Sequence, residues 1–223
     1  MSEPWFTRNR GALDELKQAL KVRHPTLHVF LDNGAAIVKG TYAVDGIGTD
    51  RYSLEIILPH DYPHSLPHVR EVAGRIPRIQ DRHVNPEGTL CLGVPEQLWM
   101  ELKGDCSVTA VLDGPIRNFL IGNGLCEMGE PWPFGERPHG GEGILEFYKE
   151  QLETDDPAKV FNFIRALAKG SMRGHWLCPC GSGKILRKCH HSTWVSLRSL
   201  PKAVLESSAT HILAQYRKTE APA

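Results

Sequence analysis

The sequence lacks any long run of apolar residues. In its 223 residues the longest apolar stretches, such as Ile56 to Leu58, have the length of a strand, whereas a membrane span needs roughly 18 residues. The first ten residues also lack the apolar core of a secretory signal. We therefore expect no membrane span and a cytoplasmic location, where the six cysteines would be thiols or metal ligands.

The sequence also lacks a net charge, because its 26 basic and 26 acidic side chains cancel. Residues 157–223 nevertheless carry 11 basic and two acidic side chains, whereas residues 1–156 carry 15 and 24. This asymmetry indicates either an acidic or nucleic-acid partner or attraction between the two parts of the chain. The aromatic residues Trp176, Trp194 and Tyr216 do not interleave with the basic residues as a stacking platform for bases would, which argues against nucleic acid.

Hydropathy patterns predict an α+β fold. Ala12, Leu13, Leu16 and Leu20 recur at helical spacing and predict a helix over residues 10–22. Segments rich in β-branched and aromatic residues, separated by turn sequences such as Asp32-Asn33-Gly34 and Asp45-Gly46-Ile47-Gly48, predict a meander of antiparallel strands. The predicted strands cover residues 27–31, 36–44, 52–58 and 68–72.

A long irregular segment follows the predicted strands. Residues 73–106 show no clear periodicity and have prolines and glycines at turn-like positions, notably in Asn85-Pro86-Glu87-Gly88. A long ordered loop of this kind usually has a function. Helices are predicted after it, at residues 107–121, 142–153, 157–169 and 201–217.

Several residues in and before this segment form a pattern around Cys91. Tyr62-Pro63, with Pro67, follows the third predicted strand and must cross the sheet as a rigid extended segment, because proline fixes φ and removes a donor. The remaining members of the pattern are His83-Val84-Asn85, Gly88-Thr89-Leu90-Cys91-Leu92 and Trp99.

Together these residues resemble the ubiquitin-conjugating enzymes, over roughly residues 8–155. That family has a Tyr-Pro segment with a further proline, a His-Pro-Asn tripeptide, a glycine three residues before the catalytic cysteine, a leucine after it and a tryptophan eight residues later. This sequence departs from the pattern at Val84, in the six-residue spacing from Asn85 to Cys91, and in Met100-Glu101, where the family has Ser-Pro. The departures indicate a divergent bacterial branch.

The resemblance implies a ubiquitin-conjugating-like fold with Cys91 as a nucleophile that carries an acyl group as a thioester and passes it to an amine. Asn85 would donate a hydrogen bond to the oxyanion, and Glu136 and His139 lie where the family often places an acidic residue that helps to deprotonate the acceptor. The acyl donor would be a ubiquitin-like protein or the C-terminus of a partner. Stand-alone bacterial relatives are associated with anti-phage (CBASS) operons, which implies a cGAS-like nucleotidyltransferase as that partner.

A second pattern lies near the C-terminus, in Cys178-Pro179-Cys180 and Cys189-His190. Three thiolates and an imidazole at this spacing match a closed, tetrahedral, structural Zn²⁺ site, with His191 as the alternative fourth ligand. The pattern resembles the SEC-C motif. Such a small segment depends on its metal for folding, so we interpret it as a zinc knuckle that acts as a docking module.

The predicted organisation is a ubiquitin-conjugating-like domain at residues 8–155, a helix and zinc knuckle at 157–191, and a helical basic tail at 192–223. Cys106 and Cys126 have no comparable surroundings and are expected to be core residues. An alternative function stays open: an inactive relative that recruits a protein or nucleic acid through the knuckle.

Overall fold

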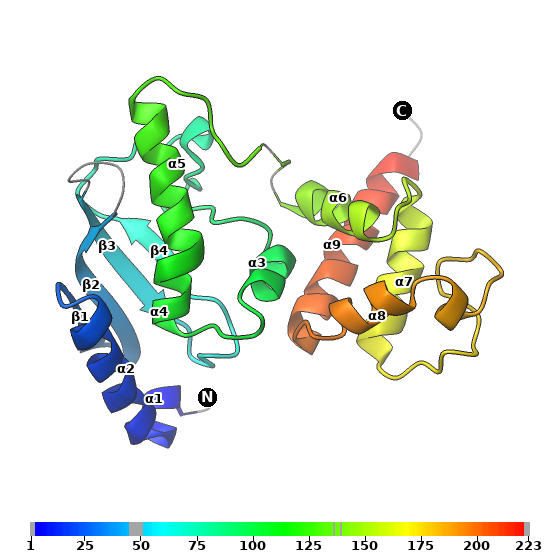
Figure 1. Ribbon diagram of the computed structural model, residues 1–223, viewed down its shortest axis with the longest axis horizontal. Helices are drawn as coiled ribbons and strands as arrows, with labels where there is room; N and C mark the ends of the chain where they lie inside the picture. The colour runs from blue at the N-terminus through cyan, green and yellow to red at the C-terminus, as the bar shows by residue number, and fades with distance from the viewer. Residues whose placement is uncertain (1–2, 45–50, 136, 139, 221–223) are drawn as a thin grey trace. The chain divides into compact units, whose positions relative to one another are not determined.

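The fold comes from a computed structural model, which describes residues 3–44, 51–135, 137–138 and 140–220, with side chains described as far as residue 216 (Figure 1). The chain divides into two compact units. The first comprises Met1–Gly93 and Asp105–Gly135, and the second comprises Val94–Gly104 and Glu136–Ala223. Among the described residues, no helix is both long and apolar enough to cross a membrane.

The described part of the first unit contains an antiparallel meander whose spatial order follows the chain. Its strands are β1 (Leu27–Asp32), β2 (Ala35–Ala43), β3 (Arg51–Leu58) and β4 (His68–Glu71). The predicted α+β class and its antiparallel strands are confirmed. Asn33-Gly34 forms the two-residue turn between β1 and β2, since Asp32 pairs with Ala35. The second predicted turn, at residues 45–48, lies outside the described residues.

Alternating side chains on β3 build one face of the core. Tyr52, Leu54, Ile56 and Leu58 are all at most 3 % exposed, as the period of two in a strand dictates. Burying each such side chain contributes about 2 kcal/mol relative to leaving it in water. This face is therefore the one that the helices of the unit must cover.

Helices of the first unit include the predicted N-terminal helix and a long helix after the sheet. Their bounds are α1 (Trp5–Arg8), α2 (Arg10–Arg23), η1 (Gln80–Arg82), α4 (Val108–Val111), η2 (Leu112–Ile116) and α5 (Arg117–Glu127). The last three run on continuously, and η2 is a wider π turn around Pro115, which has no N–H for an α-helical bond. The hydroxyls of Tyr42 and Tyr52 donate to the carbonyls of Leu112 and Leu120, at 3.1 and 3.3 Å, and so fix the helix on the sheet (Figure 1).

The second unit, in its described part, is helical apart from the segment around Cys178. Its helices are α3 (Pro95–Glu101), α6 (Gly141–Gln151), α7 (Pro157–Lys169), η3 (Leu186–Lys188), α8 (His191–Leu197) and α9 (Lys202–Glu220). The sequence predicted α6, α7 and α9 but not α3 or α8. Asp156 begins α7 by accepting hydrogen bonds from the N–H groups of Ala158 and Lys159, and Pro157 occupies the first helical position.

The two units do not follow the boundaries drawn from the sequence. The proposed domain at residues 8–155 includes α3 and α6, whereas the contacts of the structure group both helices with the C-terminal ones. For α3 the anchor is Glu96, which is only 2 % exposed and hydrogen-bonds Ser208 on α9. The chain therefore enters the second unit directly after Cys91-Leu92-Gly93 and leaves it again at Gly104.

Glu96 is a buried carboxyl group with few partners. Its Oε1 bonds the Ser208 hydroxyl, which also contacts the Val204 carbonyl at 2.7 Å and the Tyr148 hydroxyl at 3.3 Å, while its Oε2 is buried without a partner. The single hydrogen of Ser208 is shared between Glu96 Oε1 and the Val204 carbonyl when Glu96 is ionised, whereas a neutral Glu96 can donate to Ser208 instead. Burial raises the pKa of Glu96 above its ordinary value of 4.5, which agrees with the neutral form.

We expect Glu96→Gln to change how stability depends on pH. Because the folded-state pKa lies above the unfolded value, the stability that neutral Glu96 provides is complete below pH 4.5 and is lost as the pH rises through the folded-state pKa. The wild-type free energy of unfolding should lose at most about 1.4 kcal/mol per pH unit in that window, and the variant should lose less. Denaturant titrations across the window measure both slopes, with Glu101→Gln, an exposed change on the same helix, as control. Equal slopes for wild type and Glu96→Gln would contradict the neutral carboxyl.

Candidate functional site

Cys91 lies at the end of a short hairpin. The N–H of Cys91 donates to the carbonyl of His83 at 2.8 Å, Val84 pairs with Leu90, and the N–H of Asn85 donates to Thr89 at 2.8 Å. The tight turn between the two arms includes Gly88, whose φ of +86° is a conformation that favours glycine. The residue directly across from Cys91 is therefore His83, and Asn85 lies opposite Thr89.

The hairpin is fixed to the edge of the sheet. The N–H of Leu90 donates to the carbonyl of Val69 on β4 at 2.8 Å, and the side chains of Val84 and Leu90 are 6 % and 7 % exposed. Since successive side chains of an extended arm point to opposite sides, the burial of Leu90 directs Cys91 away from that apolar contact. Cys91 as a residue is accordingly half-buried.

The surroundings of Cys91 keep its sulfur protonated. Burial raises the pKa of the Cys91 thiol, and the backbone N–H of Gly93 offsets only part of that rise. The thiolate is the nucleophilic form of cysteine. Because the pKa of Cys91 is raised, its thiolate forms at a higher pH than that of an ordinary cysteine. This thiol is therefore not activated in the resting fold.

Asn85 is engaged within the hairpin turn. Its Nδ2 donates to Thr89 Oγ1 at 2.9 Å, and the Thr89 hydroxyl donates to Glu87 at 2.7 Å. The Thr89 hydrogen bond lowers the pKa of the Glu87 carboxyl, which is fully exposed. An amide nitrogen has two hydrogens and Thr89 takes one of them, so Asn85 combines a structural contact with a remaining donor hydrogen.

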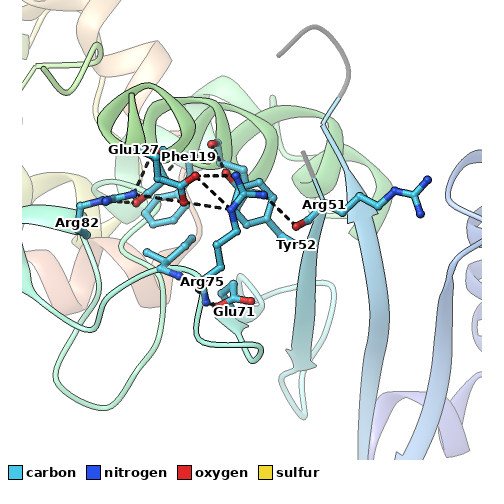
Figure 2. A network of polar contacts seen from close by, with 10 residues as sticks. Arg51, Tyr52, Glu71, Arg75, Arg82, Phe119 and Glu127 are labelled. Carbon is cyan, nitrogen blue, oxygen red and sulfur yellow. Dashed lines mark hydrogen bonds and ion pairs between the residues drawn. The ribbon is translucent and has the colours of Figure 1, made fainter. Parts of the chain in front are cut away.

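Two arginines hold the irregular segment before this hairpin against α5 (Figure 2). Arg75 binds the carboxylate of Glu127 with two nitrogens, at 2.6 to 3.2 Å, and lies over the ring of Tyr52 at 4.2 Å. Arg82 donates to the side chain and the carbonyl of Asn123 at 2.8 and 2.9 Å. At the start of the segment, the Glu71 carboxylate accepts the N–H groups of Ala73 and Arg75, both at 2.9 Å. The segment is therefore ordered by side chains rather than by a backbone ladder.

The other cysteines of the first unit differ from Cys91. Cys106 is 1 % exposed, and burial raises its pKa to about 11. Cys126 is half-buried near the end of α5. All six cysteines lie in the described residues and none forms a disulfide. Trp99, another member of the sequence pattern, is buried on α3 in the second unit, and Glu136 and His139 lie outside the described residues.

Within the described residues, one group of side chains can hold a metal ion: Cys178, Cys180, Cys189 and His190. Their ligand atoms all lie within 4.8 Å of one another. The shortest separations are 3.2 Å from Cys189 Sγ to His190 Nδ1 and 3.5 Å both from Cys178 Sγ to His190 Nδ1 and from Cys180 Sγ to Cys189 Sγ. Ligands about 2.3 Å from a tetrahedral ion would be about 3.8 Å apart, so the cluster is close to the spacing that such an ion requires.

His190 is oriented as a metal ligand. Its Nε2 lies 3.2 Å from the carbonyl of Leu152, which accepts hydrogen bonds only, so Nε2 bears the hydrogen and Nδ1 presents a lone pair to the three thiols. His191 is the exposed first residue of α8 and is not part of the group. Of the two alternatives left open by the sequence, the structure brings His190 to the cysteines.

The backbone around the cluster folds back tightly. The N–H of Cys178 donates to Lys184 at 2.8 Å, Leu177 pairs with Ile185, and the intervening Gly181 and Gly183 both have positive φ. Burial favours the neutral thiol of Cys180, but hydrogen bonds from Ser182 and the neighbouring thiols outweigh it and lower the pKa of Cys180 to about 6. A thiolate is therefore already favoured at one ligand position.

Comparisons of the chain with protein-family models, with curated proteins and with solved structures found no match.

We expect the adjacent histidines to respond differently to substitution. His190→Ala removes a ligand and should weaken metal binding more than about 100-fold, because even partners one shell further out change affinity by 10- to 100-fold. His191→Ala, one residue away, should leave affinity unchanged. Competition with a chromophoric chelator measures both. Equal affinities for the two variants would contradict the Cys178, Cys180, Cys189 and His190 ligand set.

Proposed function

We propose that the protein is a ubiquitin-conjugating-like acyl carrier, which takes an acyl group onto Cys91 as a thioester and passes it to an amine. The observation that supports this most directly is the half-buried thiol of Cys91 at the end of a hairpin whose backbone is bonded to β4 and to His83. A fixed backbone at a half-buried residue suits a group that must receive a bulky donor in one orientation. The order of helix, meander, irregular segment and helix agrees with the resemblance.

The proposed chemistry has two exchanges at one carbonyl carbon. The Cys91 thiolate attacks the donor thioester, its sulfur–carbon bond forms, and the donor leaves as a thiolate. An amine then attacks the same carbon, the carbon–nitrogen bond forms, the Cys91 thiolate leaves, and the amine gives up a proton to water. The first exchange replaces one thioester with another and needs little driving force, while the raised pKa of Cys91 lowers the fraction of thiolate that can attack at a given pH.

The metal site has a structural role in this proposal, with Zn²⁺ as the ion. Three sulfurs and one imidazole suit Zn²⁺, and four protein ligands leave no open position for chemistry. The ion would close the segment from Cys178 to His190 against the Leu152 carbonyl and the Phe163 ring, both of which contact His190. The ring of Trp194 packs on the other partner, Phe163.

The acyl donor and its anti-phage context are supported by the resemblance alone. We propose a protein C-terminus as the donor, from a ubiquitin-like protein or a cGAS-like nucleotidyltransferase, because the chemistry requires only an activated carboxyl group.

A recruiting module without catalysis is the second candidate, favoured by one surface. Trp176 and Leu177 are 47 % and 68 % exposed beside the metal cluster. The exposed basic residues near them are Arg173, Lys184, Arg187 and Lys188. Such a surface can bind a partner whether or not Cys91 reacts.

Cys91→Lys should convert a labile adduct into a stable one. A thioester on wild-type Cys91 is released by reductant or thiol, whereas the amide formed on lysine resists both. Intact mass spectrometry of protein recovered from its own host, with and without thiol, measures the adduct and its mass. Cys126→Lys is the matched control in the same unit and should add no thiol-resistant adduct. An adduct that persists in Cys91→Ala, or no adduct in any form of the protein, would overturn the proposal.

Asn85→Ala should slow transfer from Cys91 to an amine by about 100-fold or more while Cys91 is still loaded, because an oxyanion donor acts on the transition state. Single-turnover release of the acyl group to free lysine measures the effect. Thr89→Val is the control, since it removes the contact of Asn85 within the turn, together with the Thr89 bond to Glu87, and leaves the Asn85 amide in place. If Thr89→Val is as slow as Asn85→Ala, Asn85 merely holds the turn.

A further inference from the structure

His83 has a backbone conformation that needs support. Its φ is +53°, in the left-handed region, which costs a residue with a side chain of the order of 1 kcal/mol or more. This conformation turns the His83 carbonyl toward the N–H of Cys91, which it accepts at 2.8 Å. Whatever holds His83 therefore also holds the backbone of Cys91.

Trp132 is packed against His83. The two ring centres are 4.2 Å apart and the planes are tilted by 35°, which is a close contact between tilted rings. Trp132 also contacts Phe119 on α5, with ring centres 5.7 Å apart. The tryptophan thus lies between the helix and the hairpin.

Trp132 packs against α5 at Gly122, which has no side chain and so leaves space for the indole ring. A Cβ on Gly122 would lie 2.6 Å from Trp132 Cζ3 and 2.8 Å from Cη2, distances that real Cβ contacts do not show. Glycine inside a helix costs about 1 kcal/mol relative to alanine, so Gly122 is unfavourable for α5 itself. The space that it leaves is filled by the indole ring.

The neighbouring residues repeat the same connection. Arg82, next to His83, donates to Asn123, next to Gly122. Arg82 is therefore fixed to Asn123 of α5 by hydrogen bonds. The next residue, His83, is linked to Gly122 of α5 through the ring of Trp132.

From this geometry we infer that Trp132, which packs on Gly122 and on the ring of His83, is a positioning residue that sets the backbone and the burial of Cys91. The inference rests on the proposed function only for its role in acyl transfer, because the arrangement of Cys91 itself is measurable without any acyl donor. Trp132 does not touch the reacting atoms in this proposal and acts through His83.

Trp132→Ala should loosen the hairpin and expose Cys91 to water. Amide hydrogen exchange in peptides covering residues 83–91 should become faster, because the Cys91 N–H bond to His83 opens more often. The thiol pKa should fall toward its ordinary value, since burial is what raises it. Alkylation of Cys91 near neutral pH should then speed up about threefold for each unit of pKa lost, after allowing for the lower nucleophilicity of the less basic thiolate. Both measurements use the full chain and small reagents.

Three further variants distinguish a positioning role of Trp132 from a non-specific loss of stability. Trp132→Phe keeps a ring against His83 and should restore most of the wild-type exchange and alkylation profile. Phe134→Ala removes a ring that packs on the edge of Trp132, at 5.7 Å, and should change little. Gly122→Ala improves the helix propensity of α5 yet should displace Trp132 and alter Cys91 in the same direction as Trp132→Ala.

The inference is overturned if Trp132→Ala and Gly122→Ala leave both exchange at residues 83–91 and the pH profile of Cys91 alkylation as in wild type. It is also overturned if Trp132→Phe fails to restore them in a protein that folds. An absence of any acyl adduct on Cys91 would instead remove the proposed function and leave the positioning of Cys91 intact, so the two failures are distinguishable.

Discussion

The carboxylate of Glu127, at the last residue of α5, is the point on which the Cys91 region depends. A negative charge at the C-terminal end of a helix is unfavourable, and here Arg75 binds it with two nitrogens while Arg82 lies 3.8 Å away. Glu127 and Arg75 are each about 30 % exposed, so the pair is less screened than a fully exposed ion pair. Because the segment between β4 and the hairpin has little backbone ladder of its own, these side chains define where Cys91 can lie.

The elements with strong periodicity could be predicted from sequence, and those with weak periodicity could not. The apolar patterns of β3, α2, α6, α7 and α9 match their burial, whereas β1 leaves Phe30 and Leu31 exposed. In contrast, α3 has seven residues inside a proline- and glycine-rich segment, and it is fixed to the rest of its unit by Glu96 and Ser208, which are 112 positions apart. A buried carboxyl group looks like a surface residue in a hydropathy pattern, so the packing of α3 with the C-terminal helices could not be predicted.

The candidate sites divide in the same way. Ligand spacing is local chemistry, and the cluster of Cys178, Cys180, Cys189 and His190 was predictable because its members lie within 13 positions. The positive φ of Gly88 was predictable for the same reason. The contact of His83 with Trp132 could not be predicted, because these residues are far apart in the sequence. It also depends on Gly122, a residue that is unfavourable in a helix. A signal was present in Gly122, because a glycine inside a helix usually has a packing reason.

The two groups of cysteines show how environment separates the roles of one residue type. Burial is the main influence on the pKa of the Cys91 thiol, so this pKa is raised and the neutral form is favoured. Cys180 has neighbouring thiols and Ser182 as hydrogen-bond donors, which favour its thiolate despite burial. A cysteine that must hold an ion benefits from early deprotonation, whereas one that must exchange thioesters needs a thiolate basic enough to attack and stable enough to leave. Within the knuckle the thiolate is favoured only at Cys180, because burial raises the pKa of its neighbour Cys178 to about 12. The backbones of the hairpin and the knuckle are fixed by different means, one by long-range packing on α5 and the other by its own tight turns.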